Sequence, residues 1–331
     1  MDRRGSILVL AEQKNGRVHP VTHELLHGGR RLAQALNTQL SCAVIGAGRE
    51  DWQELIYRGA DRVHAVNPGE MPFFLAGPVA RALASLIREE NPVVVVAAAT
   101  TTGRTVMPLV AAWLETGLTA DCTELAIDPE SGLLLQTRPA IGGNVMATIK
   151  TPFTRPQMAT VRPHCLPPAP RDPSRRGEIM EKSYPVLSGP ERFLRFIQDT
   201  TQVVNLQEAE VVVTGGRGMK SPEGFGLVEE LAGALGAGVG ATRAAVELGW
   251  ASYSHQIGLS GKTVAPKVYI AAGVSGQIQH LAGMQTSEYI VAINKDPEAQ
   301  IFKVADLGLV GDALEIVPRL TAEIKKMKAA R

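Results

Sequence analysis

Hydrophobic and polar positions in the first part of the chain follow two different periods. Short apolar runs at residues 6–11, 40–46 and 92–99 predict buried strands, whereas residues 22–36 and 73–90 have apolar positions at helical spacing. Strands and helices that alternate at this distance along a chain are typical of a parallel sheet with helices on both faces. The first part of the chain is therefore predicted to be an α/β domain.

The pattern changes after residue 118. Short β-like runs follow one another up to residue 162, with glycine- and proline-containing turns between them. Strands joined by short turns favour antiparallel pairing, so we expect an antiparallel extension of the first, mostly parallel sheet. The next stretch is rich in proline and charge, which is typical of a linker. We therefore predict a first domain at residues 1–165, a linker at 166–186 and a second domain at 187–331.

The second domain repeats the alternation of strands and helices. Apolar runs at 209–216, 267–273 and 288–294 predict buried strands, and residues 224–236 and 312–327 are predicted helices. This order of elements indicates a doubly wound, Rossmann-like domain.

Composition and charge narrow the possible functions. The 331 residues are 45% hydrophobic and carry a net charge of +1, so a basic nucleic-acid-binding surface is not indicated. The three cysteines, Cys42, Cys122 and Cys165, are far apart, which argues against a metal or iron–sulfur site. No apolar run reaches the roughly 18 residues of a membrane-spanning helix. We expect a cytoplasmic protein without metal or membrane insertion.

Some glycine-containing stretches match nucleotide-binding loops only in part. A phosphate-binding loop that ends in Gly-Lys-Thr needs a glycine where Gln256 stands, before Gly261. The Gly-x-Gly pairs at 236–241 and 46–51 lack the third glycine of the dinucleotide fingerprint. These stretches do not identify a nucleotide site by themselves.

The glycine-rich turn after the strand at 267–273 is a better candidate. Ser275-Gly276 begins a predicted helix at 275–284 that contains His280. The first amides of a helix have no helical partner and lie at the positive end of its dipole, which favours a phosphate group. Alternatively, Ser275 only caps its helix and His280 is an ordinary polar residue. This stretch alone leaves both interpretations open.

Polar residues also follow other predicted strands of the second domain. Arg217, Thr242, Arg243 and Asn294 lie in loops after apolar runs, so we expect them at one edge of the sheet. Two arginines at this edge favour a large anionic ligand with a polar head.

Three stretches of the second domain carry a more specific pattern. They read TGGRGMKSPEGFGLVEELAGALGAGVGATRAAVELGW, GLSGKTVAPKVYIAAGVSGQIQHLAGM and IVAINKDPEAQIFKVADLGLVGD. These stretches resemble the alpha subunit of the electron-transfer flavoprotein family, and the resemblance covers residues 205–331. The first domain resembles the same subunit more loosely. The resemblance implies an N-terminal α/β domain and a C-terminal domain that binds one FAD.

The resemblance implies roles for the matching positions. Arg243 would lie against the isoalloxazine ring and, with His280, stabilise the negative charge that a flavin gains on reduction. Ser260, where many members have threonine, would donate a hydrogen bond to flavin N5, and Asn294 and Asp312 would contact the adenosine half. Arg243, His280 and Ser260 would thus tune the flavin without covalent chemistry. The full set implied for FAD binding is Arg217, Thr242, Arg243, Gln256, Ser260, Ser275, Gly276, Gln279, His280, Asn294 and Asp312.

The resemblance also implies a heterodimer with a beta subunit. Simple carriers of the family hold FAD and AMP, are reduced by dehydrogenases and are oxidised by a quinone reductase. Electron-bifurcating members hold a second FAD in the beta subunit, which NADH reduces. They send electrons to an acyl-CoA dehydrogenase or similar acceptor and to ferredoxin or flavodoxin.

Two stretches of the first domain, 116–125 and 136–149, resemble the bifurcating or nitrogen-fixation-type group. We therefore expect a bifurcating member, with the simple carrier as the alternative. Thr101, Thr102 and Arg104 are expected at the interface with the second flavin. A self-sufficient flavin reductase would need a nicotinamide site in this chain, and a nucleotide sensor would bind an adenine nucleotide without flavin.

Overall fold

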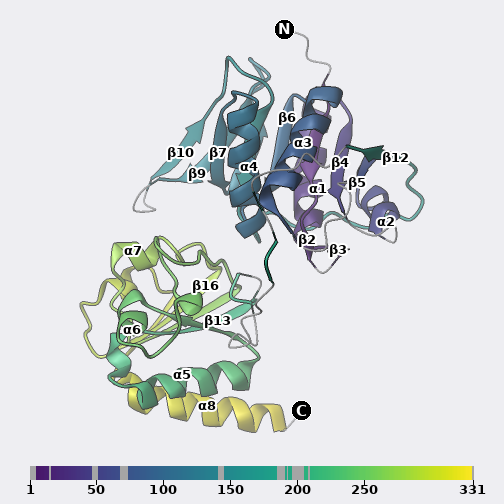
Figure 1. Cartoon of the computed structure of the whole chain (residues 1–331). Coiled ribbons are helices and arrows are strands. Elements are labelled where there is room, and N and C mark those ends of the chain that lie inside the picture. The colour runs from purple at the N-terminus through teal and green to yellow at the C-terminus, as the bar shows by residue number, and fades with distance from the viewer. Residues whose placement is uncertain are drawn as a thin grey trace. The chain divides into compact units, whose positions relative to one another are not determined.

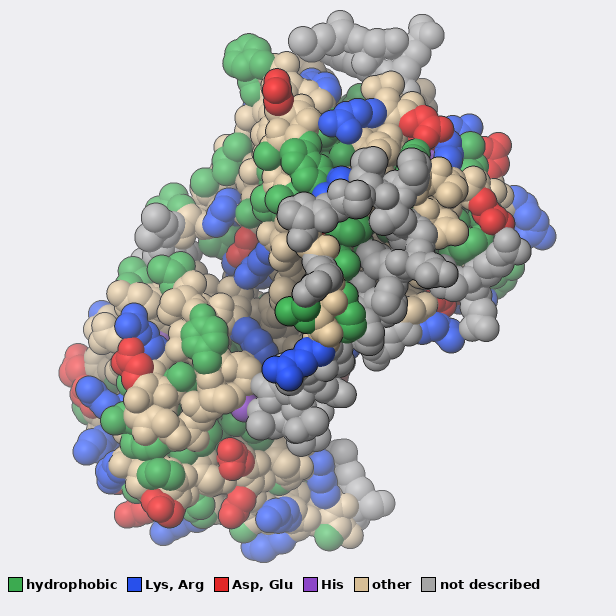
Figure 2. Space-filling model, viewed as in Figure 1, with side chains coloured by type: hydrophobic (Ala, Val, Ile, Leu, Met, Phe, Trp, Pro, Cys, Tyr) green, Lys and Arg blue, Asp and Glu red, His purple; other side chains and the backbone are tan. Residues whose placement is uncertain are grey.

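The structure is a computed structural model that divides into two compact units (Figure 1). Residues 1–139 and 146–196 form the first unit, and residues 140–145 and 197–331 form the second. On the face shown in Figure 2, acidic and basic side chains are interspersed over both units. Within the described ranges, no helix is both long and apolar enough to cross a membrane. The structure describes residues 5–14, 16–46, 51–67, 74–140, 145–184, 191, 193–195, 205–207 and 209–329.

A parallel sheet forms the centre of the first unit. Its strands are β1 Ile7–Leu10, β4 Leu40–Ile45, β5 Arg62–Asn67, β6 Val94–Ala98, β7 Leu118–Cys122, β11 Gln157–Val161 and β12 Glu178–Ser183. Its helices are α1 Val21–Ala35, α2 Trp52–Tyr57, α3 Ala76–Glu90 and α4 Thr101–Trp113. A short antiparallel pair, β2 Gln13–Lys14 and β3 Arg17–Val18, follows β1.

The strands of this sheet lie in the order β12-β5-β4-β1-β6-β11-β7, and every neighbouring pair is parallel. Side chains of α1 and α2 pack on one face, and side chains of α3 and α4 pack on the other. Because helices cover both faces, the central strands β1, β4 and β6 are buried at every position. The predicted α/β fold is confirmed.

The expected antiparallel extension is found only in part. Strands β8 (Glu124–Ile127), β9 (Leu134–Pro139) and β10 (Met146–Ile149) pair antiparallel in a separate sheet of order β10-β9-β8. The first and last β-like runs, β7 and β11, belong to the parallel sheet instead. Two parallel strands need a long crossover connection between them. The segment that contains β8, β9 and β10 provides it for β7 and β11, so that both strands run in the same direction.

The segment 166–186, which we predicted to be a linker, contributes to the first unit. Its last part is β12, which pairs with β5 at the edge of the sheet as far as Ser183. Arg175 Nη2 lies 2.7 Å from Oδ1 of Asp61, directly before β5. A charged residue of this segment thus has a partner next to the sheet. The division between the two units falls after residue 196.

The second unit has its own parallel sheet, as predicted. Its strands are β13 Val211–Gly215, β14 Gly238–Ala241, β15 Val268–Ala272, β16 Tyr289–Asn294 and β17 Leu307–Val310. Its α-helices are α5 Pro222–Leu235, α6 Arg243–Glu247, α7 Ile278–Leu281 and α8 Ala313–Ala329. Single 3-10 turns lie at Arg217–Met219, Tyr253–His255 and Gln300–Lys303.

The strand order β14-β13-β15-β16-β17 places a topological switch point between β13 and β15. Helices α5 and α8 lie side by side on one face of this sheet (Figure 1). The other face is covered mainly by loop segments, including the residues around Ile257, Met284 and Ile301. In such folds ligands bind outside the carboxyl ends of the strands, at the switch point.

Local signals set the ends of α5. The Ser221 side chain accepts a hydrogen bond from the amide of Gly224 at 3.1 Å, and Pro222 takes the first helical position. Gly236 ends the helix with φ of 71°, a conformation that glycine adopts without a steric penalty.

Candidate functional site

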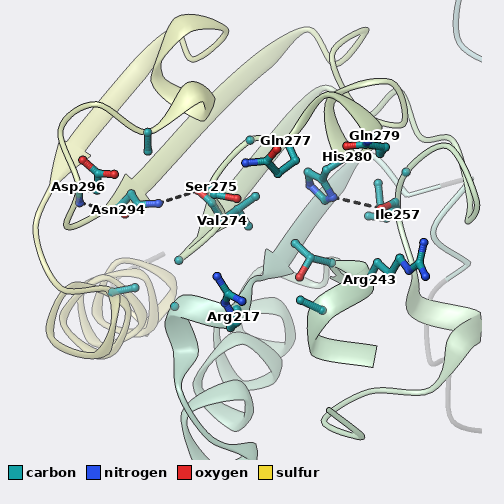
Figure 3. A pocket seen from close by; sticks show the side chains of 18 of the residues that line it. Arg217, Arg243, Ile257, Val274, Ser275, Gln277, Gln279, His280, Asn294 and Asp296 are labelled. Carbon is teal, nitrogen blue, oxygen red and sulfur yellow. Dashed lines mark hydrogen bonds between the residues drawn. The ribbon is translucent and has the colours of Figure 1, made fainter. Parts of the chain in front are cut away.

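A cavity of about 890 Å³ lies at the carboxyl ends of the strands of the second unit (Figure 3). The loop after each strand contributes to its wall: Arg217 after β13, Thr242 after β14, Ser275 after β15, Asn294 at the end of β16 and Asp312 after β17. This volume lies within the range of about 300–1,000 Å³ that is usual for small-molecule and cofactor sites.

The residues predicted for this site converge on the cavity. Every member of the predicted set lines it: Arg217, Thr242, Arg243, Gln256, Ser260, Ser275, Gly276, Gln279, His280, Asn294 and Asp312. Sequence reasoning missed others, among them Lys220, Glu247 and Asp296. Their spacing could have indicated them, because Glu247 lies one helical turn after Arg243 and Lys220 shares a short loop with Arg217.

Two loops touch backbone to backbone on one wall of the cavity. The amide of Gly218 donates a hydrogen bond to the carbonyl of Gly273 at 2.9 Å. A Cβ atom on Gly216 would lie 2.2 Å from the same carbonyl oxygen, and Gly273 has φ of 62°. The β13 and β15 loops can approach this closely only because neither carries side chains at the contact.

The turn after β15 differs from the prediction. We expected a helix from residue 275, but α7 begins at Ile278 and ends at Leu281. Gly273 and Gly276 have φ of 62° and 79°, and left-handed residues interrupt a helix. Ser275 and Gly276 therefore belong to a glycine turn, and the turn is held by a hydrogen bond of 3.1 Å from Ile301 N to the Ser275 carbonyl.

Four successive residues of this turn, 274–277, line the cavity. Among the residues that the structure describes, no acceptor is found for the amides of Val274, Ser275, Gly276 and Gln277. Successive free amides in a turn form a concave anion site without a long helix. Any phosphate bound here would therefore meet the amides of a glycine turn and not the first turn of a long helix, which differs from the prediction.

Arg217 and Arg243 both line the cavity, and among the described residues only Arg243 has an ion-pair partner. Arg243 Nε lies 2.7 Å from Glu247 Oε1 on the same helix, and the arginine side chain is 72% exposed. In the described part of the chain, no carboxylate lies within ion-pair distance of Arg217. Thr242 accepts a hydrogen bond from Ala245 N at 3.4 Å and so caps α6. The cavity therefore contains a cation that a ligand can neutralise.

Asn294 and Asp312 line the cavity and also form hydrogen bonds with neighbouring loops. Asn294 Nδ2 donates to the carbonyl of Val274 at 2.8 Å, and its Oδ1 accepts from the amide of Asp296 at 3.0 Å (Figure 3). Asp312 accepts from Lys220 Nζ at 2.8 Å and from the amide at the second position of α8 at 3.0 Å. The hydrogen bond from Lys220 holds the pKa of Asp312 below its usual value.

Gln256 and Ser260 form a pair on the loop that precedes β15. Gln256 is buried and donates from Nε2 to the Ser260 hydroxyl oxygen at 3.0 Å. The Tyr253 hydroxyl donates to the Ser260 carbonyl at 2.5 Å. Because the hydroxyl oxygen of Ser260 already accepts a hydrogen bond, its own hydrogen is available to an acceptor in the cavity.

His280 is buried and neutral. Its Nδ1 lies 3.1 Å from the carbonyl oxygen of Ile257 (Figure 3), and its Nε2 lies 2.9 Å from the hydroxyl of Tyr269. Burial lowers the pKa of His280 to about 4. At neutral pH this shift favours a neutral imidazole, so any help that His280 gives to Arg243 would come from hydrogen bonding and not from a positive charge.

The residues expected at the second-flavin interface lie in the first unit, at the start of α4. Thr101 and Arg104 are exposed, Thr102 is partly buried, and Thr100 caps the helix by accepting from Gly103 N at 3.2 Å. Arg104 Nη2 lies 3.2 Å from Oδ1 of Asp121. These residues lie at the carboxyl end of β6.

The same Asp121 also pairs with a nearly buried arginine. Arg162 Nη2 lies 2.6 Å from Asp121 Oδ2. Burial alone would raise the pKa of Asp121, but the hydrogen bonds from Arg162 and Arg104 outweigh it and lower the pKa.

Comparisons with known proteins agree with this architecture. Residues 7–187 match the model of the electron transfer flavoprotein domain, and residues 205–285 match that of the electron transfer flavoprotein FAD-binding domain. The electron transfer flavoprotein subunit alpha of Thermoanaerobacterium thermosaccharolyticum is 47% identical over 97% of this chain and 98% of its own length. The same subunit of Megasphaera elsdenii is 44% identical over 97% of both chains. Protein FixB of Azotobacter vinelandii is 43% identical over 96% of this chain and 91% of its own length.

Proposed function

Because the chain belongs to the electron transfer flavoprotein family, as an alpha subunit, we propose that it binds one FAD in the cavity of its second unit. In this role it would carry electrons within a heterodimer that it forms with a beta subunit. The observation that carries the proposal is the convergence on one cavity of the 274–277 amides, Arg217 and the Gln256–Ser260 pair, the amides and Arg217 having no acceptor or ion-pair partner among the described residues.

The chemistry of these groups suits FAD. The free amides of residues 274–277 and the guanidinium of Arg217 would hold the pyrophosphate, since both are donors that favour anions. The Ser260 hydroxyl would donate to a ring nitrogen of the flavin, with Gln256 holding its oxygen in place.

Arg243 would set the reduction potential of the site. A bound flavin supplies the electron-accepting group, which becomes more negative when it is reduced. A nearby guanidinium stabilises the reduced form, and each 1.4 kcal/mol of such stabilisation raises a one-electron potential by about 59 mV. Glu247 would partly offset this effect, because its carboxylate also lines the cavity and contacts Arg243.

We further propose that the heterodimer bifurcates electrons. The beta subunit would hold a second FAD and take electrons from NADH. This chain would pass one electron toward an acyl-CoA dehydrogenase or similar acceptor, while the other goes to ferredoxin or flavodoxin. The resemblance of residues 116–125 and 136–149 to the bifurcating group supports this proposal. In the same complex, Thr101, Thr102 and Arg104 would face the second flavin.

The first test is to purify the chain with its beta subunit, count bound flavins and follow the visible spectrum during titration with NADH. Two FADs per heterodimer and bleaching by NADH are expected for a bifurcating protein. One FAD with AMP and no response to NADH would contradict bifurcation and identify a simple carrier. Absence of flavin would refute the proposed FAD site itself.

A further inference from the structure

The buried hydroxyl of Tyr269 begins a chain of hydrogen bonds that reaches the cavity wall. Tyr269 lies within β15, is 0% exposed and packs in the apolar cluster beneath the cavity loops. Its hydroxyl lies 2.9 Å from His280 Nε2, and His280 Nδ1 lies 3.1 Å from the Ile257 carbonyl. His280 lines the cavity, so the chain connects the sheet to the site.

The direction of these hydrogen bonds is fixed by their end groups. A carbonyl oxygen can only accept, so His280 Nδ1 carries the hydrogen. Burial keeps the imidazole neutral, which leaves Nε2 as an acceptor for the hydroxyl of Tyr269. Burial also raises the pKa of Tyr269, so the hydroxyl remains a donor. One tautomer of His280 satisfies both partners.

The far end of the chain is the loop that carries Gln256 and Ser260. The amide of Ile257 donates to the carbonyl of Ala241 at the end of β14, at 2.9 Å. The carbonyl of Gln256 accepts from the amide of Lys262 at 2.7 Å, which closes the loop around Ser260. The imidazole of His280 holds the neighbouring carbonyl, that of Ile257, and so ties this loop to β15.

We propose that Tyr269 is a positioning residue for the cofactor, which acts through the neutral His280 on the loop that presents Gln256 and Ser260. The inference rests on the proposed FAD site and assigns a role to a residue that does not line the cavity. Without the Tyr269 hydroxyl, His280 Nε2 loses its donor and the ring is free to change tautomer or turn. The loop then loses the fixed hydrogen bond to Ile257, and the Ser260 hydroxyl loses its fixed place.

The test compares two variants of the heterodimer that each lose one buried hydroxyl. Tyr269→Phe removes the first donor of the chain. Thr321→Val is the matched control, because the Thr321 hydroxyl is also buried in this unit but donates to the Val317 carbonyl within α8, at 2.9 Å. FAD affinity, flavin midpoint potential and the visible flavin spectrum are measured for both, together with thermal unfolding.

Both variants are expected to lose a few degrees of thermal stability, because each removes one buried hydrogen bond. Only Tyr269→Phe is expected to weaken FAD binding, by about tenfold, and to shift the potential and spectrum of the bound flavin. If Tyr269→Phe matches Thr321→Val in affinity, potential and spectrum, Tyr269 is only a core residue and the inference is overturned. If the unmodified heterodimer binds no flavin, the proposed function fails first, so the two failures are distinguishable.

A second measurement is made on the unmodified heterodimer, so it does not depend on whether Tyr269→Phe folds. Nitrogen NMR of histidine-labelled heterodimer reports the tautomer of each ring, and His280→Asn identifies the His280 signals by their loss. The expected result is a neutral ring with hydrogen on Nδ1 and an accepting Nε2. A protonated Nε2 at neutral pH would overturn the inference.

Discussion

Replacement of Gly276 by alanine tests whether the turn after β15 holds the cofactor. Gly276 has φ of 79°, and a Cβ there would lie 2.2 Å from the amide nitrogen of Ile301. The left-handed conformation costs an alanine about 1 kcal/mol. The overlap with backbone adds about 1–3 kcal/mol of overpacking, and loss of the Ile301–Ser275 hydrogen bond adds about 1 kcal/mol. We expect a total of about 4 kcal/mol, most of it at the turn that lines the cavity.

Gly236 provides the matched control. It also has a left-handed φ, 71°, but a Cβ there would meet nothing within 4 Å. Gly236→Ala should therefore cost only the conformational term, about 1 kcal/mol. Both variants are made in the heterodimer and compared by urea unfolding and by titration of the flavin-free protein with FAD.

The expected difference lies in FAD binding. If the displaced turn loses about 2.7 kcal/mol of its contacts with the pyrophosphate, the dissociation constant of Gly276→Ala rises about 100-fold. Gly236→Ala should bind FAD as the unmodified protein does. Equal FAD affinity in the two variants would refute the reasoning that the 274–277 amides hold the cofactor.

Three further predictions concern the scaffold. Asp121→Asn should destabilise the first unit by about 3 kcal/mol in urea unfolding, because it removes the carboxylate that lies 2.6 Å from the nearly buried Arg162 guanidinium. The pKa of Asp121 is lower in the folded protein than in the unfolded chain, so the Asp121–Arg162 pair contributes its full stabilisation above the unfolded-state pKa of Asp121. This stabilisation is lost as the pH falls through the folded-state pKa. A difference in unfolding free energy between the unmodified protein and Asp121→Asn that does not decrease in acid would contradict this. Gly233→Ala should stabilise the protein by about 1 kcal/mol, because a Cβ in the interior of α5 meets nothing within 4 Å; an unchanged or lower urea midpoint would argue against it. The thiols of Cys42 and Cys122 should resist iodoacetamide at pH 8 until the protein unfolds, because burial raises the pKa of each to about 12, and rapid labelling of the folded protein would show that they are accessible.

The sequence predicts where helices and strands lie better than it predicts which strands are neighbours in a sheet. Apolar runs identify buried strands because parallel strands covered on both faces contain few polar positions. Such runs do not show which strands lie side by side. The runs that form β7 and β11 are therefore predicted to be antiparallel, whereas the structure places them in the parallel sheet. Similarly, a stretch rich in proline and charge predicts a linker, and only the fold shows that its Arg175 pairs with Asp61.

The residues of the candidate site could also be predicted only in part. The loop residues could be predicted as a group, because parallel strands bring their carboxyl ends to one edge and the family motifs mark those loops. The protonation state of His280 could not, since it depends on burial and on partners far away in the sequence. Tyr269 was missed because a tyrosine in an apolar strand resembles any other core residue.

The backbone contact of Gly216 and Gly218 with Gly273 has a consequence for how this site can change over generations. Any side chain at Gly216 would collide with the opposite loop, so single mutations cannot make this part of the wall shallower or deeper while the loops stay in contact. Changes in ligand affinity or redox behaviour are thereby directed to exposed side chains of the wall, such as Arg243 and Glu247. The fold thus separates a backbone contact that excludes side chains from exposed side chains that a single substitution can change.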